Sequence, residues 1–355
     1  MSDFIRQQVL PHFGIGLDKV TISTLGNGHI NQTYLVRWPK GEFVLQRINT
    51  DVFTQPNLLI ENALHVSEHL QQQVEQGHYQ LQVVKPVSAQ DKQYAINLGD
   101  DGYWRAITYL PNSHTIEVVT NTEQAKMAAG AFGHFVAALS SLNPDCINDV
   151  IKDFLNFPFR LQQLQQAVSD DKCQRLSECQ YWVDLVFSQH ALFDELEQVE
   201  LLLPLRVCHN DTKINNMLFD ERDMSSMAII DLDTCMKGYL MYDFGDMVRA
   251  FCSPEEEDST ALDKVIARPE IIAAASESYI KALEGIITPI EKRSLWLGIK
   301  VMALMLGSRF LADHINGDAY FSIHRPNHNL DRAANQLTIF KSLLGQEAKL
   351  KPLFE

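Results

Sequence analysis

The sequence has 355 residues, of which 46% are hydrophobic and 21% charged, a composition that excludes a disordered, fibrous or multi-span membrane protein. A globular chain of this length suits two domains or two lobes of one fold. Lys and Arg total 30 against 45 Asp and Glu, so the net charge is -15. Such a field repels nucleic acid and anionic lipid; we therefore expect neither partner, and any phosphate site must be local.

The cysteines and the apolar stretches indicate the compartment. The six cysteines include no Cys-x-x-Cys pair, which is typical of reduced thiols in the cytoplasm. The first residues show no basic region followed by the apolar core of a secretory signal. The most apolar stretch, residues 295–307, is too short to span a bilayer and contains Lys300, so it predicts a buried helix. We expect a cytoplasmic protein without a membrane partner.

Residues 1–110 have the pattern of a small antiparallel sheet with one helix. Runs rich in β-branched and aromatic residues are bounded by the turns GNG, PKG and GDDG, and the apolar residues of one segment recur at helical spacing. We predict strands over 20–25, 32–38, 42–49 and 104–110, and a helix over 57–73.

Residues 111–355 form a second, mainly helical lobe in this interpretation. The helical pattern begins at residues 122–142 and continues to the end of the chain, interrupted by the strand-like residues 227–233. The predicted fold class is therefore α+β, with a β-rich N-terminal lobe and a larger helical C-terminal lobe.

The first segment that suggests chemistry is the turn between the first two predicted strands, LGNGHINQTYLV. Glycines at such a turn allow backbone amides to approach a phosphate closely. Asn-Gly is also the strongest ordinary hairpin signal, and the turn lacks the G-x-G-x-x-G form of a dinucleotide site, so a plain hairpin remains an alternative. The candidate phosphate-binding residues are Gly26, Asn27, Gly28, His29 and Asn31.

The second is RVCHNDTKINNMLFD, which places His209, Asp211 and Asn216 on a polar loop between apolar runs. In phosphoryl transfer an Asp accepts the proton of the attacking hydroxyl, and an Asn five residues later ligates Mg²⁺ through its amide oxygen. Lys213 is placed to screen the γ-phosphate charge, or is a surface lysine. The alternative for the whole loop is a cluster of Asx-turns that satisfies its own backbone.

The third is the apolar strand SMAIIDLDT, which ends in Asp231 and Asp233. Alternation along a strand puts both carboxylates on one side, where a cation would offset their repulsion. A solvated strand end is the alternative. A glycine turn, an Asp-x4-Asn loop and an Asp-bearing strand follow one another here in the order found in kinases. The later letters DFG mark a metal ligand in protein kinases. Here their aspartate, Asp243, comes after the strand and before an amphipathic helix, so we interpret Asp243 or Asp246 as a helix N-terminal cap and local organiser.

These motifs resemble those of the aminoglycoside phosphotransferase and choline kinase superfamily. The superfamily pattern begins with His-x-Asp, has Asn after four further residues, and continues with Ile-Asp and a later Gly and Asp. In this sequence it falls on His209, Asp211, Asn216, Ile230, Asp231, Gly238 and Asp243. The resemblance implies a bilobal protein-kinase-like fold, catalysis by Asp211, His209 and Lys213, and ATP as cosubstrate. It also implies Mg²⁺ held by Asn216, Asp231 and Asp233, and nucleotide contacts at the glycine turn, Gln46 and Tyr109.

The C-terminal motifs RFLADHINGDAYF and HNLDR are similar to those of a subgroup that phosphorylates the anomeric hydroxyl of N-acetylglucosamine or N-acetylgalactosamine. This similarity implies sugar contacts at Asp211, Arg309 and Asp313. Arg309 and Asp313 are also spaced as an ordinary i,i+4 pair. A kinase for choline, homoserine or an aminoglycoside is the alternative within the superfamily, and a nucleotide-binding pseudokinase acting as a partner module is the alternative outside catalysis.

Gln46 departs from the superfamily pattern, because kinases usually place a lysine at this strand position to hold the α and β phosphates. A neutral amide loses a charge-assisted contact, so we expect nucleotide binding to depend more on Mg²⁺ and on the amides of the glycine turn. Glu61, the natural helix partner of such a lysine, is then expected to be a solvated helix residue.

Overall fold

The computed structural model describes residues 1–16, 19–26 and 30–355, which form two compact units. The first unit contains residues 1–114, 141–152 and 218–237, and the second contains 115–140, 153–217 and 238–355. Each unit is thus assembled from separate stretches of chain. Asp231 belongs to the first unit with the sheet, whereas Asp211 belongs to the second.

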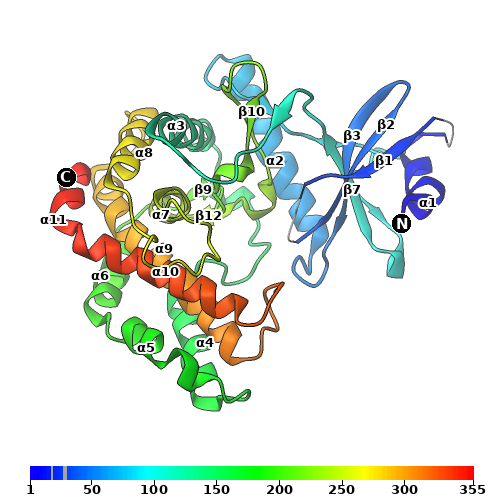
Figure 1. Ribbon diagram of the computed structural model, residues 1–355. Helices are drawn as coiled ribbons and strands as arrows, with labels where there is room; N and C mark the ends of the chain where they lie inside the picture. Colours follow the sequence, from blue (N-terminus) through cyan, green and yellow to red (C-terminus); the bar gives the residue numbers. More distant parts are fainter. Residues whose placement is uncertain (17–18, 27–29) are drawn as a thin grey trace. The chain divides into compact units, whose positions relative to one another are not determined.

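An antiparallel sheet dominates the first unit (Figure 1). Its strand order is β1-β2-β3-β7-β5, and β6 also pairs with β7. The four longest strands of this sheet coincide with the predicted ones within a few residues, because they are the runs rich in β-branched and aromatic residues that lie between turns. The strands are β1 (Thr21–Thr24), β2 (Gln32–Trp38), β3 (Gly41–Ile48), β5 (Pro86–Val87), β6 (Ile96–Asn97) and β7 (Tyr103–Thr108).

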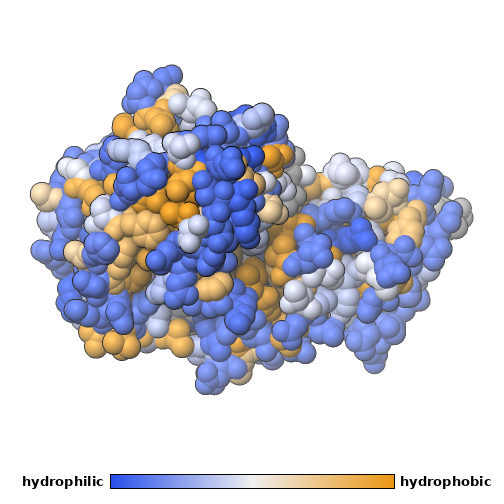
Figure 2. All heavy atoms as spheres, turned by 90° about the horizontal axis from the view of Figure 1, so that it is seen from below, coloured by the Kyte–Doolittle hydropathy of each residue, from blue (hydrophilic) through white to orange (hydrophobic). Residues whose placement is uncertain are grey.

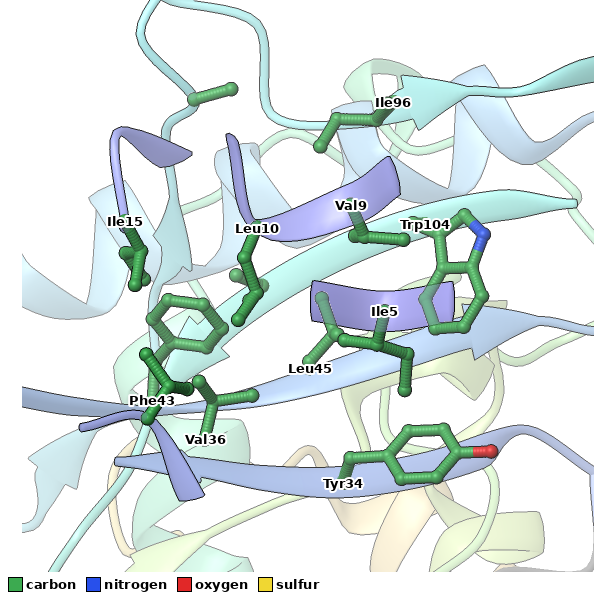
Figure 3. Packing of buried hydrophobic residues seen from close by; sticks show 13 residues of the cluster. Ile5, Val9, Leu10, Ile15, Tyr34, Val36, Phe43, Leu45, Ile96 and Trp104 are labelled. Atoms are coloured by element: carbon green, nitrogen blue, oxygen red, sulfur yellow. The ribbon is translucent and has the colours of Figure 1, made fainter. Parts of the chain in front are cut away.

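The N-terminal residues pack on one face of this sheet and make its core (Figure 3). They form three short helical segments, α1 (Ser2–Phe4), η1 (Ile5–Val9) and η2 (Leu10–Phe13). Ile5, Val9 and Leu10 are fully buried against alternate residues of β2, β3 and β7, among them Leu45 and Trp104. Because the side-chain period of a strand is two, the intervening residues point to the opposite face.

Helix α2 (Pro56–Glu75) and a second, smaller sheet complete the first unit. Asn62 anchors α2, since its amide donates to the carbonyls of Asn148 and Cys235 and its Oδ1 accepts from the Asn148 amide at 2.8 Å. Glu61 is exposed on the same helix, as expected. The second sheet has the order β4-β11-β10-β8, made by β4 (Gln82–Val83), β8 (Ser113–His114), β10 (Met217–Asp220) and β11 (Ser226–Ile229).

The second unit is a helical assembly around α9 (Figure 1). Helix α9 is long and apolar enough to cross a membrane, but most of its side chains are buried by α4, α7 and α10, which makes it a core helix. This confirms the buried helix predicted for residues 295–307. The helices are α3 (Thr122–Leu139), α4 (Phe157–Asp170), α5 (Leu176–Phe187), α6 (His190–Glu200), α7 (Leu240–Cys252), α8 (Pro269–Ala282), α9 (Pro289–Ile315), α10 (His328–Gly345) and α11 (Glu347–Leu350).

Helices α7 and α9 cross with their backbones in contact. A Cβ atom on Gly245 would collide with the carbonyl of Gly298, and one on Gly298 would collide with the carbonyl of Met241. Only glycine permits this approach. The crossing fixes α7, which carries the two aspartates that organise the candidate active site.

The architecture confirms the predicted α+β class, with strands concentrated in the first unit and helices in the second. On the face shown in Figure 2, hydrophilic side chains predominate and apolar areas are scattered among them. Such a surface suits the excess of acidic residues in the sequence.

Candidate active site

The loop of residues 209–216 follows strand β9 (Arg206–Cys208), and buried carboxylates of α7 hold its backbone. Asp243 accepts hydrogen bonds from the backbone amides of His209 at 2.9 Å and Asn210 at 2.6 Å. Asp246 accepts from the amide of Thr212 at 3.0 Å, and the Thr212 hydroxyl donates to the Asp243 carbonyl. Charged acceptors make stronger bonds than neutral ones, so this loop is rigidly placed.

The prediction that Asp243 or Asp246 caps its own helix is wrong. Helix α7 begins at Leu240, its N-cap residue is Tyr239, and no side chain caps it. Asp243 lies one turn inside the helix and turns its carboxylate toward the loop of residues 209–216. It is a local organiser, as the same prediction stated, but it acts on a segment more than thirty residues away in the sequence.

Protonation of Asp243 gives a testable pH dependence. Burial raises the pKa of Asp243 to about 6, above its ordinary range, although His209 and the two backbone amides oppose the shift. The ionised form is the better acceptor for these amides, so we expect kcat to fall reversibly as the pH drops through about 6. The free energy of unfolding should change in the opposite direction to kcat. Because the pKa of Asp243 is higher in the folded protein than in the unfolded chain, its contribution to stability is complete below about pH 4 and is lost as the pH rises through 6.

The side chain of Asp243→Asn cannot ionise. The change near pH 6 that we expect in kcat and in the free energy of unfolding of the wild type should therefore be absent from this variant. Parallel pH profiles of activity and of urea unfolding for the two proteins measure this. An unchanged step in the variant would assign the titration to another group.

His209 is placed as a structural support for the loop. Its ring is fully buried between Phe132 and Phe135, with ring centroids 5.6 and 5.7 Å apart in edge-to-face geometry. Its Nδ1 atom lies 3.3 Å from the backbone amide of Asp211. A fully buried ring does not reach the reacting atoms, so the geometry favours a positioning role over the predicted catalytic one.

Asp211, Asn216 and Lys213 form a connected group at the open side of the same loop. The Asn216 amide nitrogen donates to Asp211 Oδ2 at 2.8 Å, and Lys213 Nζ lies 3.2 Å from Asp211 Oδ1. Burial would raise the pKa of Asp211, but Lys213, His209 and the bond from Asn216 outweigh it and hold this pKa below its ordinary value. The Asp211 carboxylate is therefore ionised at neutral pH and can accept a hydrogen bond from a hydroxyl.

A buried cation balances the acidic groups around this loop. Arg249 donates to Asp246 Oδ1 through Nε at 2.9 Å and Nη2 at 2.7 Å, and to Glu257 through Nη1 at 2.8 Å. The pairing raises the pKa of Arg249 against the effect of its burial. Arg249 thus offsets part of the negative charge behind the loop.

In the first unit, the predicted metal residue Asp231 follows β11 in a left-handed conformation, with φ of 59°. Such a conformation costs about 1 kcal/mol or more for a residue with a side chain, and it concentrates at functional sites. Asp231 opens the short turn η6 (Leu232–Thr234). Strand and turn together fix where this carboxylate is presented.

Asp233, the other predicted metal residue, is engaged by protein groups. Its Oδ1 lies 2.5 Å from Arg105 Nη2 in a buried ion pair, and its Oδ2 accepts from the side-chain amide of Asn31 at 2.7 Å. The backbone amide of Asn49 donates to Asn31 Oδ1, so both polar ends of the Asn31 side chain are occupied. Asp233 and Asn31 therefore brace the first unit in this structure.

Gln46 and Tyr109, two predicted nucleotide contacts, lie on or beside the large sheet. Gln46 Oε1 accepts two hydrogen bonds from Arg105, at 2.9 and 2.7 Å. Tyr109 is half-buried directly after β7 and lies beneath the guanidinium of Arg37. Gly26 takes a left-handed conformation, with φ of 67°, at the end of the described part of the glycine turn. The predicted residues Asn27, Gly28 and His29 lie outside the described residues.

Arg309 lies at a cavity of about 290 Å³ in the second unit. Its guanidinium carbon is 5.7, 5.8 and 5.3 Å from the ring centroids of Phe154, Tyr320 and Phe321. Arg160 lines the same cavity and donates to the Phe154 carbonyl and to Gln163 Oε1. Its Nε atom is buried without a hydrogen-bond partner in the described part of the chain.

Asp313 does not pair with Arg309. Its Oδ1 accepts from the backbone amides of Ala319 and Tyr320, and its Oδ2 accepts from the Phe321 amide and the Asn329 side chain, at 2.8 to 3.0 Å. Four donors on one buried carboxylate fix the segment that carries the two aromatic rings beside Arg309. The geometry favours a positioning role for Asp313 in place of the predicted contact with a sugar.

The family follows from a direct comparison. Residues 21–274 match the model of the phosphotransferase enzyme family, which is more than half of the chain. The chain belongs to this family. The phosphotransferase also shares its fold with solved kinase structures. This similarity confirms the kinase-like fold implied by the motifs.

Three such structures cover nearly the whole length of the phosphotransferase. A microcompartment-associated aminopropanol kinase is 15% identical, with a TM-score of 0.60 and 99% of each chain covered. A choline kinase from Cryptosporidium parvum Iowa II is 12% identical, with a TM-score of 0.55 and complete coverage of both chains. A spectinomycin phosphotransferase in complex with ADP and spectinomycin is 10% identical, with a TM-score of 0.54, covering 95% of this chain and 98% of that one.

Sequence reasoning missed Arg105 and Arg160, as it did Arg249. Arg105 lies within a run that reads as an ordinary strand, and Arg160 within a run that reads as an ordinary helix. An arginine at the centre of an otherwise apolar strand was the available signal for Arg105, since charged residues are almost never fully buried unless they are paired.

Proposed function

We propose that this phosphotransferase transfers the γ-phosphoryl group of ATP to the anomeric hydroxyl of an N-acetylhexosamine, giving the sugar 1-phosphate and ADP. ATP as donor is supported by the family and by the ADP bound to the similar spectinomycin enzyme. The sugar as acceptor is supported by the C-terminal motifs and, above all, by the charge of the cavity beside Arg309.

Three basic side chains (Arg160, Lys172 and Arg309) and two acidic ones (Asp170 and Asp313) line that cavity, so positive charge is in excess. In the described part of the chain, neither Arg160 nor Arg309 lies within 4.0 Å of a carboxylate. Burial and the nearby charge of Arg309 lower the pKa of Arg160 to about 10, and burial also lowers the pKa of Arg309. The positive charge of these two guanidinium groups would repel an acceptor that is itself a cation, such as an amino alcohol or an aminoglycoside.

A neutral polyhydroxyl acceptor fits the same groups. Arginine carries planar, fixed N–H donors that suit hydroxyl oxygens and an acyl carbonyl, and Arg160 Nε is an unpartnered donor at this place. Gln163 and Asn316 add amide groups to the lining, and Tyr320 and Phe321 add rings against which the apolar face of a sugar can pack. These are the donors and surfaces by which an uncharged sugar would be recognised.

The loop of residues 209–216 supplies the groups for the transfer itself. The ionised Asp211 accepts a hydrogen bond from the anomeric hydroxyl and takes its proton as the bond to phosphorus forms. Lys213, kept protonated by Asp211 and partly exposed, lies where it offsets negative charge on the transferring group. Asp243 and Asp246 hold the loop in position without contacting either substrate.

The oxygen donors of this chain fit Mg²⁺. In the second unit, Asn216 donates through its amide nitrogen to Asp211, which leaves its Oδ1 as the ligand atom. In the first unit, Asp231 is the carboxylate that the motif pattern assigns to the metal. Among the described residues there is no group of three His, Cys, Asp or Glu side chains able to hold a metal alone. Mg²⁺ characteristically binds through one or two protein ligands and the phosphates of its nucleotide, so this sparse donor set suits it. When bound, the ion neutralises phosphate charge.

An acceptor screen tests the proposal. Purified protein with MgATP is offered N-acetylglucosamine, N-acetylgalactosamine, choline, homoserine and kanamycin, and ADP release is followed. We expect turnover with one or both amino sugars and at least tenfold lower kcat/KM with the three cationic or zwitterionic acceptors. Turnover with choline or kanamycin in place of the sugars would refute the sugar assignment, and ADP release from none of them would favour the pseudokinase alternative.

Arg309→Ala should raise the sugar KM about tenfold, equivalent to about 1.4 kcal/mol, and leave the KM for ATP nearly unchanged. The expected loss comes from removing donors to the acceptor, while the groups around Asp211 stay in place. Initial-rate kinetics with each substrate varied in turn measure it. Arg293→Ala on the same helix is the control outside the cavity; an equal effect on both KM values would show that Arg309 acts on the fold of the unit.

A further inference from the structure

A row of polar side chains crosses the face of the large sheet opposite its apolar core. Strand register pairs Thr33 with Gln46 and Gln46 with Arg105, on β2, β3 and β7. Gln46 donates to the Thr33 hydroxyl at 3.3 Å and accepts twice from Arg105. The neighbouring residues Tyr34, Leu45 and Trp104 belong to the apolar core in Figure 3, so the row is directed to the opposite face of the sheet.

Arg105 is the charged residue of this row and lies at its β7 end. Its side chain is 4% exposed, and it is held by Gln46 on one side and by the Asp233 carboxylate at 2.5 Å on the other. These bonds use Nε and Nη2, and a guanidinium has five N–H donors. The two donors on Nη1 make no hydrogen bond with the described residues.

The ion pair connects the sheet to two parts of the candidate nucleotide site. Asp233 is two residues from Asp231, the predicted metal ligand, and it also accepts from Asn31, which begins the chain after the glycine turn. A buried ion pair adds little stability by itself compared with apolar residues of the same shape, because two charges must lose their hydration. Its position between these segments points to a binding role.

We propose that Arg105 supplies the phosphate-binding positive charge of the first unit, in the place where other kinases use a lysine on the strand of Gln46. The positive charge is displaced by one strand, from β3 to β7, and Gln46 serves as the acceptor that orients the guanidinium plane. Asp233 takes the part of the carboxylate partner, which explains why Glu61 on α2 is exposed. Nη1 of Arg105 is the donor directed to the α and β phosphates. This inference rests on the nucleotide part of the proposed function.

The test measures nucleotide binding directly and needs no acceptor. Binding of MgADP and of adenosine to the wild type, Arg105→Gln and Arg105→Lys is followed by calorimetry and by ligand-observed NMR. We expect Arg105→Gln to weaken MgADP binding tenfold or more and to leave adenosine binding within twofold, because adenosine lacks phosphates. The MgADP affinity of Arg105→Lys should lie between those of the wild type and Arg105→Gln. Arg47→Gln, at the neighbouring position of β3, is the matched control and should change neither affinity.

A double variant separates phosphate binding from support of the fold. Gln46→Lys alone should not improve MgADP affinity, since its ammonium would face Arg105 and remove the acceptor that orients it. When Gln46→Lys is added to Arg105→Gln, the double variant should bind MgADP at least threefold more tightly than Arg105→Gln alone. An equal loss of MgADP and adenosine in Arg105→Gln, or strictly additive effects in the double variant, would overturn the inference.

Two further results have distinct meanings. A wild-type protein that binds no MgADP would contradict the proposed function as a whole, whereas unchanged MgADP binding in Arg105→Gln would contradict this inference alone. If Arg105→Gln does not fold, as judged by thermal unfolding, the comparison of Arg105→Lys with wild type decides, since Lys retains the charge and loses the paired geometry. Equal affinities for MgADP in these two proteins would then overturn the assignment of the Arg105 donors.

Discussion

Asp211→Asn is expected to lower kcat by about 10²-fold or more and to change the KM values of ATP and sugar little, because proton transfer to the carboxylate occurs mainly in the transition state. Asparagine has the same shape and can still accept from Asn216, so the loop of residues 209–216 should keep its place on Asp243 and Asp246. What the variant loses is the negative charge that receives the proton of the acceptor hydroxyl.

Steady-state kinetics with both substrates varied, together with MgADP binding, measure this effect. Asp194→Asn, on the exposed side of α6, is a control for the removal of one negative charge and should leave kcat unchanged. If Asp211→Asn keeps more than about a third of the wild-type turnover, Asp211 is not the base.

Asp231→Asn should abolish productive use of MgATP, with partial rescue by excess Mg²⁺ at best, since a neutral amide is a much weaker ligand for a hard cation than a carboxylate. The left-handed conformation of residue 231 makes this replacement well suited, because asparagine tolerates positive φ as readily as aspartate does. The variant is therefore expected to fold and to fail in metal-dependent nucleotide binding.

The measurement is a titration of activity and of ADP affinity with Mg²⁺ in the wild type and the variant. Asp223→Asn, in the exposed turn between β10 and β11, is the control from the same small sheet. An unchanged metal titration in Asp231→Asn would move the ligand to another residue. Asp233 would be the next candidate, although its contacts with Arg105 and Asn31 make it the poorer one.

The elements predicted best are those with a strong local sequence signal. β2, β3 and β7 are rich in β-branched and aromatic residues and lie between turns, and α2 has one apolar face, so local pattern alone was sufficient for them. The buried helix α9 followed from the apolar stretch of residues 295–307, which is too short to span a bilayer and contains Lys300. The short strands β4, β5, β6 and β8 were missed, because two residues carry no periodicity.

The candidate site was predicted where its residues are close in the sequence. Asp211, Lys213 and Asn216 do form one connected group. Contacts over long separations were not accessible: Asp243 reaches back more than thirty residues to the loop, and Asp233 reaches Arg105 across 128 residues. Such partners depend on the packing of strands and helices, which local pattern does not specify.

The central claim is that the anomeric oxygen of an N-acetylhexosamine receives the phosphoryl group. Phosphorus NMR of the product formed from MgATP and N-acetylglucosamine or N-acetylgalactosamine, combined with a reducing-end assay, tests it most directly, because phosphorylation at the anomeric oxygen destroys the reducing end and phosphorylation of the primary hydroxyl does not. We predict a sugar 1-phosphate that no longer reduces, formed in equal amount with ADP. A phosphorylated sugar that still reduces would contradict this account.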